Sequence, residues 1–201
     1  MNHKLYKQIS EYQPYDEREK IDKEVMLNFI KSNEDVLTRD NKVAHFTTSA
    51  WITNKERTKV LMIYHNIYDS WAWVGGHADG DDDLFHVINK EIEEETGLTN
   101  IKPLIEGIYG INIVTVDNHI KRGHIVNSHL HFDVEYLFEA NDNDNIRIEE
   151  DENSGVKWIN IDEVNNYTTE EKMKPIYSRL TKKLIKLNNK RWFLVDRNHL
   201  F

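Results

Sequence analysis

Three glutamates, Glu91, Glu94 and Glu95, lie close together in residues 75–98. At about 100° per residue of helix, the three side chains fall within a wedge of about 100°. Three negative charges placed side by side repel one another unless a cation lies among them. Carboxylate oxygens that leave coordination positions open suit Mg²⁺ or Mn²⁺ bridging to a substrate phosphate. The spacing therefore predicts a divalent metal site for phosphate chemistry.

The same segment predicts the helix that must hold these carboxylates, over residues 83–96. An apolar stripe runs beside the glutamates, and Gly97 can end the helix in the left-handed conformation. The stripe consists of Leu84, Phe85, Ile88 and Ile92. A solvated acidic face is the alternative interpretation of so many glutamates. The glycines at both ends of the segment favour the metal site.

The register of these residues resembles the signature box of the Nudix hydrolases, G-x5-E-x7-R-E-U-x-E-E-x-G-U, where U is an aliphatic residue. The positions that match outright are Gly76, Glu91, Ile92, Glu94, Glu95, Gly97 and Leu98. Asp82 stands where the family has Glu, and Lys90 where it has Arg, so both departures keep the charge. In the family these two residues brace the loop against the helix, and the resemblance implies a pair between Asp82 and Lys90. The pair should hold less firmly because lysine lacks the planar bidentate fork of arginine.

The resemblance implies an α/β protein with the Nudix fold, an α/β/α sandwich around a mixed sheet, preceded by an N-terminal helical extension. It also implies a pyrophosphohydrolase that acts on acid anhydrides with Mg²⁺ or Mn²⁺. Glu91, Glu94 and Glu95 are then catalytic residues and metal ligands, joined by the main-chain carbonyl of Gly75. A carboxylate from a later loop often helps to activate water in relatives, and Glu152 is the candidate here. A solvated loop acid is the alternative interpretation of Glu152.

Four further residues are candidate substrate contacts: His77, Trp73, His129 and His131. His77 directly follows the glycine pair, where an imidazole could contact a phosphate or make a hydrogen bond that stabilises the loop. Trp73, together with Trp71, either forms a wall of the core or offers a surface on which a base can rest. The two later histidines offer a similar place for a base or sugar.

A strict alternation of polar and apolar residues runs through residues 128–138 and predicts a strand with one largely polar face. That face carries His129, His131, Asp133 and Glu135. We expect these side chains to line a polar cleft, since alternating polar residues usually mark a solvent or cleft face. A metal site formed by the ladder itself is the alternative interpretation.

Periodicity predicts the elements around the site. Residues 15–32 have the apolar spacing of an amphipathic helix. Its stripe consists of Ile21, Val25 and Phe29, with Met26 and Ile30 on the flank. Strands are expected at residues 45–53, 58–65, 105–116 and 156–161, and a final amphipathic helix at residues 174–187. The chain thus divides into an extension, residues 1–42, and a Nudix domain that includes the C-terminal helix, residues 43–201.

Composition limits the partners. With 26 basic and 35 acidic residues among 201, the net charge is −9, which argues against long nucleic acid bound along a basic surface. The sequence has no run of 18 apolar residues and no apolar export signal at its N-terminus, so no membrane partner is expected. It also has no cysteine, which excludes disulfides and a cysteine nucleophile. We expect a cytoplasmic protein with a small phosphorylated substrate, and a homodimer is one assembly that the extension would allow.

Three functions compete at this point. The leading hypothesis is hydrolysis of the diphosphate linkage in a small nucleoside diphosphate derivative, such as a dinucleotide or a nucleotide sugar. A non-catalytic Nudix-fold module that binds nucleotides is the second, but such modules usually lose the glutamates that this chain keeps. An enzyme similar to isopentenyl-diphosphate isomerase is the third, and it is disfavoured because that branch employs a catalytic cysteine.

Overall fold

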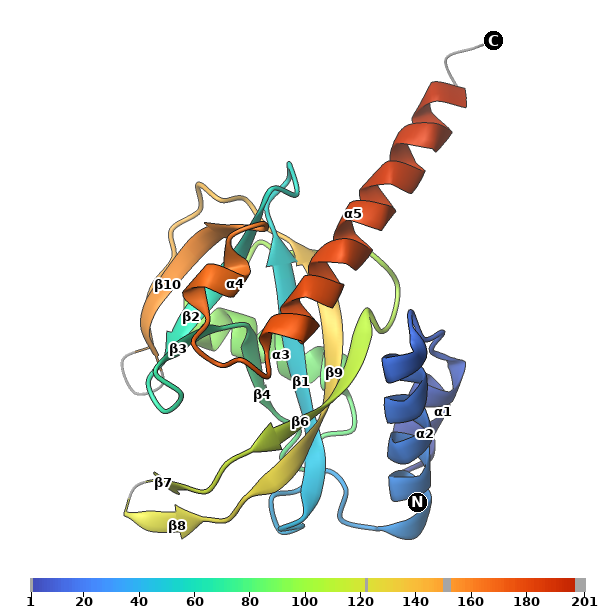
Figure 1. Ribbon diagram of the computed structural model, residues 1–201, viewed down its shortest axis with the longest axis vertical. Coiled ribbons are helices and arrows are strands. Elements are labelled where there is room, and N and C mark those ends of the chain that lie inside the picture. The colour runs from blue at the N-terminus through green and yellow to red at the C-terminus, as the bar shows by residue number, and fades with distance from the viewer. Residues whose placement is uncertain (1, 122, 150–152, 198–201) are drawn as a thin grey trace.

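The computed structural model describes residues 2–121, 123–149 and 153–197 and contains one large curled sheet between helices (Figure 1). The sheet has eight strands in mixed orientation, and a separate two-stranded ribbon extends beside it. In chain order the elements are α1 (His3–Glu11), α2 (Glu17–Ser32), β1 (Ala44–Thr53), β2 (Lys59–His65), β3 (Ser70–Ala72), β4 (Val74–His77), α3 (Leu84–Thr96), β5 (Lys102–Pro103), β6 (Gly110–Val116), β7 (His119–Lys121), β8 (His124–Val126), β9 (His129–Glu139), β10 (Asn153–Asn160), α4 (Val164–Tyr167) and α5 (Lys174–Arg197). The predicted sandwich of helices around a mixed sheet is confirmed.

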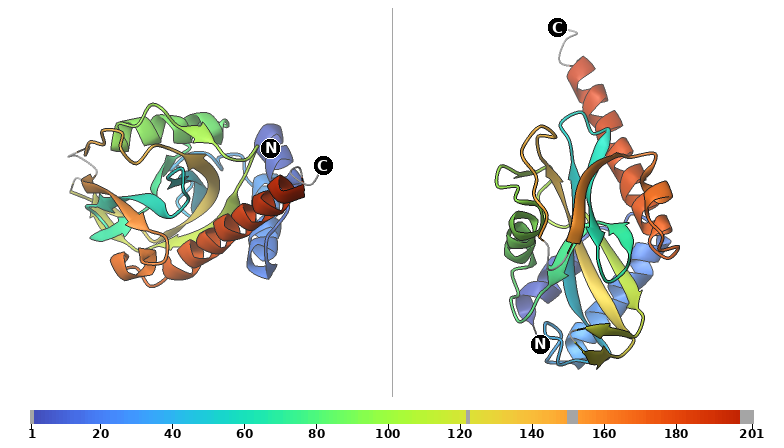
Figure 2. Two further views of the ribbon diagram at one scale, coloured as in Figure 1. Left: turned by 90° about the horizontal axis from the view of Figure 1, so that it is seen from above. Right: turned by 90° about the vertical axis from the view of Figure 1, so that its left-hand side faces the viewer.

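Strands β1 and β9 run parallel at the centre of the sheet, paired from Ala44 opposite Leu130 onward. Because side chains alternate between the faces of a strand, each of the two strands sends one row of residues toward α3 and the other toward α5. Phe46 belongs to the core cluster beneath α3, and Trp51 to the cluster beneath α5. The two helices therefore cover opposite faces of the sheet (Figure 2).

Helix α3 forms where the sequence predicts it because both of its ends carry local signals. The side chain of Asp83 accepts a hydrogen bond from the backbone N of His86 at 3.0 Å and so caps the N-terminus. Gly97 ends the helix with a φ of 74°, a left-handed conformation that glycine adopts without strain. Ile88 and Ile92 are fully buried against the sheet. This packing fixes which edge of the helix reaches the glycine pair of β4.

The N-terminal extension forms two helices, α1 and α2, that lie together at one side of the sheet (Figure 1). The sequence does not predict α1, and it places the apolar stripe of α2 wrongly. Met26 and Ile30 are fully buried, whereas Ile21 and Val25 are 51% and 43% exposed. The physical reason is that the packed face of α2 includes a charged residue, Glu19, which shifts that face around the helix.

The carboxylate of Glu19 is fully buried and ties α2 to α5. Its Oε1 accepts a hydrogen bond from Nζ of Lys183 at 2.8 Å and lies 3.5 Å from Nε of Arg179. Its Oε2 accepts hydrogen bonds from the backbone N of Tyr15 at 2.7 Å and from the hydroxyl of Tyr12. One carboxylate therefore compensates two cations of α5 at the interface with the extension.

We expect Glu19→Gln to lower the free energy of unfolding by at least about 3 kcal/mol, because it removes the buried carboxylate charge that pairs with both Lys183 and Arg179. Urea denaturation followed by circular dichroism measures the loss. Glu17→Gln is the matched control, since Glu17 lies on the same helix in an exposed pair with Lys20 at 3.3 Å. Equal losses in the two variants would contradict the role assigned to Glu19.

Helix α5 continues beyond its predicted end at residue 187 to Arg197. Asn188, which we expect to end the helix, instead lies inside it and accepts a hydrogen bond from Arg57 in the turn between β1 and β2. A tertiary contact therefore replaces the local stop signal. Within the described residues, no helix is both long and apolar enough to cross a membrane.

Candidate active site

Glu95 joins α3 to the glycine pair of β4. Its side chain is only 2% exposed, and Oε2 accepts a hydrogen bond from the backbone N of Gly75 at 3.2 Å. Strand pairing holds this glycine in turn, because Gly75 lies opposite Ser49 of β1. The side chain and the main chain that the sequence assigns to one metal ion are therefore neighbours.

Glu91, one helical turn before Glu95, lies directly against the second glycine. A Cβ atom built on Gly76 would lie 2.3 Å from both Cδ and Oε1 of Glu91. No side chain fits in that space, so glycine is what allows the carboxylate to approach the β4 backbone. Two of the three glutamates thus meet the glycine pair from the same helix.

Glu94 is the most exposed of the three glutamates. Its side chain is 50% exposed, and its Oε2 lies 3.1 Å from Nζ of Lys90, one helical turn earlier. Asp82 pairs instead with Nζ of Lys4, at 3.3 Å. The predicted pair between Asp82 and Lys90 is therefore wrong. Each residue has another partner, and Lys4 belongs to a helix that the sequence does not predict.

The two acidic residues on the polar face of β9 are buried. Asp133 is 4% exposed and accepts hydrogen bonds from the hydroxyls of Thr47 at 2.7 Å and Ser49 at 2.5 Å. Burial raises the pKa of Asp133 to about 6, and the two hydroxyl groups oppose that rise. Glu135 is fully buried with a hydrogen bond from Asn112, and burial raises the pKa of Glu135 well above its usual range. The polar residues thus point into the protein on the α5 side of the sheet.

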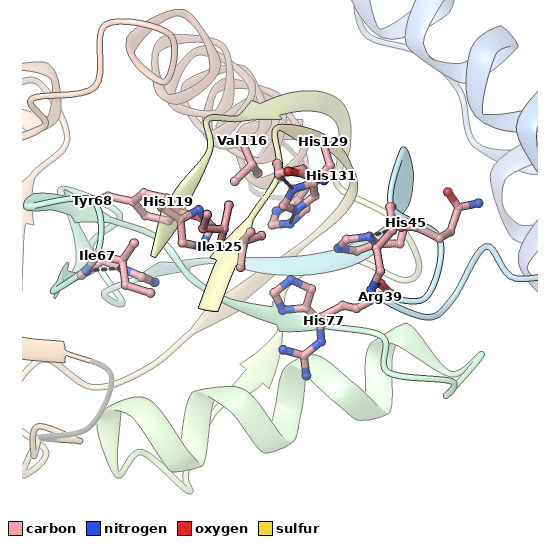
Figure 3. Close-up of a pocket in the computed structure, with 15 residues that line it drawn as sticks. Arg39, His45, Ile67, Tyr68, His77, Val116, His119, Ile125, His129 and His131 are labelled. Atoms are coloured by element: carbon pink, nitrogen blue, oxygen red, sulfur yellow. Dashed lines mark hydrogen bonds between the residues drawn. The ribbon is translucent and has the colours of Figure 1, made fainter. Parts of the chain in front are cut away.

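A cavity of about 380 Å³ opens near the ends of β1, β4 and β9 (Figure 3). Its walls include six of the chain's ten histidines: His45, His65, His77, His119, His129 and His131. Among the residues that the structure describes, the lining also contains the cations Arg39 and Lys42 and no carboxylate. Nε of Arg39 donates a hydrogen bond to Oδ1 of Asp79 at 2.8 Å, so one of these two cations is already paired with a carboxylate.

Four of these histidines form a cluster. The ring centroid of His45 lies 5.1 Å from that of His131, 5.2 Å from that of His77 and 4.9 Å from that of His129. Burial, followed by repulsion from His77 and the other rings, lowers the pKa of His131 to about 2. Burial also lowers the pKa of His45. Both of these rings are therefore neutral at physiological pH.

The structure brings three of the four predicted substrate contacts together. His77, His129 and His131 line the cavity described above. Trp73 lines a smaller neighbouring cavity of about 70 Å³, which His131 also borders. Trp71 lines neither cavity and packs on neighbouring aromatic rings. The three histidines thus share one wall, and their contact with substrate stays a prediction.

Sequence reasoning did not single out His45, Arg39 or Tyr68, although all three line the cavity. Alternation along β1 could have found His45, because it places this residue on the same face as the hydroxyls that bind Asp133. The positions of the other two depend on loops, for which no sequence pattern gives a location. Glu152, the predicted later carboxylate, lies outside the described residues.

Comparisons with known proteins agree with this architecture. The family model described as NUDIX domain matches residues 43–180. Among solved structures, an Ap4A hydrolase from C. elegans in a binary complex has a TM-score of 0.51 at 16% identity, covering 72% of this chain and 98% of that chain. A NUDIX-family hydrolase from Clostridium perfringens has a TM-score of 0.49 at 21% identity, with coverage of 71% and 97%. The NUDIX domain of Shewanella oneidensis NrtR, solved with ADP ribose, has a TM-score of 0.47 at 16% identity, with coverage of 79% and 96%.

A search of curated protein sequences finds no match. Because the family model covers more than half of the residues, the chain belongs to the Nudix hydrolase family.

Proposed function

We propose that this chain is a metal-dependent pyrophosphohydrolase that cleaves the diphosphate linkage of a small nucleoside diphosphate derivative. The observation that carries the proposal is the contact between α3 and the glycine pair, with Glu95 at the N–H of Gly75 and Glu91 against Gly76. His77, which directly follows Gly76, lines the cavity of about 380 Å³, and the described lining of that cavity contains no carboxylate. The carboxylates and a binding site for an anion are thus linked through three consecutive residues of one strand.

Glu91, Glu94, Glu95 and the carbonyl of Gly75 would hold Mg²⁺ or Mn²⁺. Oxygen donors fit these hard cations, and a cation offsets the cost of the buried Glu95 charge. The pair between Glu94 and Lys90 is exposed, and such pairs contribute about 1 kcal/mol or less, so a divalent ion can compete for Glu94. When bound, the cation supplies neutralisation of the negative charge on the diphosphate oxygens.

The chain's own residues divide the remaining work. To Glu91, which lies against Gly76, we assign the orientation of the attacking water and the acceptance of its proton. His77 lines the cavity on the opposite face of β4 from Glu91, and we assign to its imidazole a hydrogen bond to a more distant oxygen of the same substrate. Glu152 stays the candidate for a second carboxylate near the water. Glu91 and this second carboxylate would together hold the attacking water in line with the diphosphate, as phosphoryl chemistry requires.

The cavity suits such a substrate in size and in chemistry. Its volume of about 380 Å³ lies within the range typical of sites for small ligands. Ile67, Tyr68 and Val116 provide apolar walls against which a base can pack. The imidazoles provide donors for phosphate oxygens, whereas Nε and Nη2 of Arg39 already bind the carboxylate of Asp79. A nucleoside and its diphosphate therefore find matching groups along the same wall.

The two alternative functions are less well supported. A non-catalytic binding module does not need the three glutamates, and this chain keeps all of them, with Glu91 and Glu95 beside the glycine pair. An enzyme similar to isopentenyl-diphosphate isomerase lacks its nucleophile here, because the chain contains no cysteine. The cytoplasmic location and the homodimer stay predictions, which fractionation of cells and light scattering of the purified protein can test.

A substrate panel tests the proposed function. The purified protein is incubated with dinucleotides, nucleotide sugars and nucleoside triphosphates in the presence of Mg²⁺, and the products are separated by chromatography. We expect turnover of at least one diphosphate derivative, with full loss in excess EDTA. Tight binding of a nucleotide without turnover of any compound would instead support the binding module, and full activity in EDTA would contradict the metal dependence.

We expect a small nucleotide to be a better substrate than capped RNA. A protein with a net charge of −9 repels an extended polyanion, whereas one diphosphate can be compensated by bound cations and a local basic residue. Competition kinetics at physiological salt compare kcat/KM for the best small nucleotide and for a capped RNA oligomer. Comparable values for the two would show that net charge does not set the choice of substrate.

A further inference from the structure

Three histidines from three different strands converge on the wall of the cavity. His45 lies on β1, His77 on β4 and His131 on β9, and one ring nitrogen of each lies within 4.8 Å of the others. His45 is paired directly with His131, and Thr47, two residues after His45, is paired with His77. Residues two apart in a strand share a face, so the sheet directs all three imidazoles to one side. Figure 3 shows the three rings gathered at this point.

We propose that His45, His77 and His131 bind a divalent transition-metal ion, such as Zn²⁺, at a site separate from the α3 glutamates. A tetrahedral ion with Zn–N bonds of about 2.0–2.1 Å holds its nitrogen ligands about 3.3 Å apart. The three nitrogens are now at most 4.8 Å apart, so binding requires side-chain rotations that bring them closer together. Among the described residues, no other group of three or more His, Cys, Asp or Glu side chains brings its potential ligand atoms this close together.

His45 has the arrangement of a metal ligand. It is 4% exposed, and its Nδ1 lies 3.2 Å from the carbonyl oxygen of Asn41. A carbonyl only accepts hydrogen bonds, so Nδ1 carries the proton and Nε2 keeps a lone pair. That Nε2 is buried and has no hydrogen-bond partner among the described residues. A backbone carbonyl behind the ring and a free lone pair in front are how proteins orient ligating histidines.

His129 supports the site from one side. Its Nδ1 lies 2.8 Å from the carbonyl of Asn127 and therefore carries the proton. Its Nε2 lies 3.1 Å from Nε2 of His131 and accepts the hydrogen of that ring. Such contacts behind a ligand hold the ring in a fixed orientation. His131 is thus held in place by a second imidazole.

The imidazole cluster and the glutamates lie on opposite faces of β4. A Cβ atom on Gly76 would point toward Glu91. Because side chains alternate along a strand, the side chain of the next residue, His77, points to the other face of β4. The two sites also differ in their donor atoms. Oxygen ligands suit Mg²⁺ or Mn²⁺, whereas imidazoles select ions such as Zn²⁺, Co²⁺ and Ni²⁺. The chain therefore offers separate places for two kinds of ion.

The cavity gives the proposed ion a role. Three protein ligands leave one tetrahedral position open, as in zinc sites that bind a further group. The three histidines all line the cavity, so the open position is accessible from it. A bound ion would add positive charge to a wall that already lacks carboxylates, and an anionic group of a ligand could complete its coordination.

Metal titration of the protein without substrate tests the proposal. The protein is purified without a polyhistidine tag, stripped with a chelator, and titrated with Zn²⁺ in a calorimeter and with Co²⁺ in a spectrophotometer. We expect one equivalent of Zn²⁺ to bind in the presence of excess Mg²⁺, and Co²⁺ to give the visible absorption of a tetrahedral site. His45→Gln, His77→Gln and His131→Gln should each weaken Zn²⁺ binding at least about a hundredfold, because even changes behind a ligand cost about 10- to 100-fold.

Two control variants distinguish this site from binding at a surface histidine or at the α3 glutamates. His86→Gln removes a histidine with a 69% exposed side chain on α3 and should leave Zn²⁺ affinity unchanged. Glu95→Gln should also leave it unchanged, which makes the result independent of the hydrolase site. Circular dichroism and thermal unfolding verify that each variant is folded. The proposal is overturned if no Zn²⁺ binds to the unmodified protein, if the three cluster variants bind it as tightly, or if the metal-free cluster binds inorganic phosphate in place of the ion.

Discussion

Glu95→Gln is expected to lower kcat at least about a hundredfold while the protein stays folded. The glutamine keeps an oxygen that can accept the hydrogen bond from Gly75, so the link between α3 and β4 is retained. It removes one negative charge that the proposed cation requires, and lost charge stabilisation of this kind costs about 10²- to 10³-fold. Glu94→Gln is expected to act in the same direction. Steady-state kinetics at saturating Mg²⁺ measure the effect.

Glu93→Gln is the matched control for this experiment. It removes the same charge from the same helix, but Glu93 is exposed and lies outside the carboxylate wedge. We expect its kcat to stay within about twofold of the unmodified enzyme, because surface charges have weak effects at physiological salt. A similar loss in both variants would mean that the net charge of α3, rather than a ligand at Glu95, controls the rate.

Helix α3 could be predicted from the sequence because its signals are local. Asp83 and Gly97 act within one turn of the helix ends, and the spacing of Ile88 and Ile92 indicates which face of the helix is buried. The placement of Glu91 and Glu95 against the glycine pair depends on one further fact, the antiparallel pairing of β4 with β1. The family resemblance assigned Gly75 and the glutamates to one site without giving that pairing, and periodicity alone gives neither.

Contacts between distant segments could not be predicted in this way. Glu19 is charged, and charged residues are almost never fully buried unless they are paired. Its partners, Lys183 and Arg179, lie on a helix more than 150 residues later, as the sequence numbers show. Ile21 therefore looked like a core residue although it is 51% exposed. The error in α2 and the missed partner of Asp82 have the same origin, since both depend on how the extension packs.

The cavity lies between these two cases. Alternation within one strand indicated that His129 and His131 share a polar face, and the structure places both in the same wall. His45 joins them only because β1 runs parallel to β9 in a register that sets it opposite His131. A single sequence contains no pattern for that register. The strand therefore predicted a polar cleft, but not the convergence of three imidazoles.

Gly76→Ala is expected to lower kcat about a hundredfold with little change in the thermal midpoint. The new Cβ would lie 2.3 Å from Oε1 of Glu91, which is too short for a contact between non-bonded carbon and oxygen atoms, so the Glu91 side chain must move. A displacement of about 1 Å in a catalytic group can cost about 10²-fold in rate. Glu91 is not part of the buried core, so the fold can accommodate the shift. Steady-state kinetics and thermal unfolding give the two measurements.

A double-mutant cycle identifies the residue through which the alanine acts. If the methyl group harms activity by moving the Glu91 carboxylate, then adding Gly76→Ala to Glu91→Gln should cost much less than adding it to the unmodified enzyme. Gly155→Ala provides the control, because its Cβ would meet side chains away from the glutamates, Cη2 of Trp71 at 3.1 Å and Cβ of Tyr64 at 3.4 Å. We expect that variant to keep kcat within about twofold. An equal loss from Gly76→Ala in both backgrounds would show that the alanine distorts β4 itself, and the close approach of Glu91 to the glycine would then not be what catalysis requires.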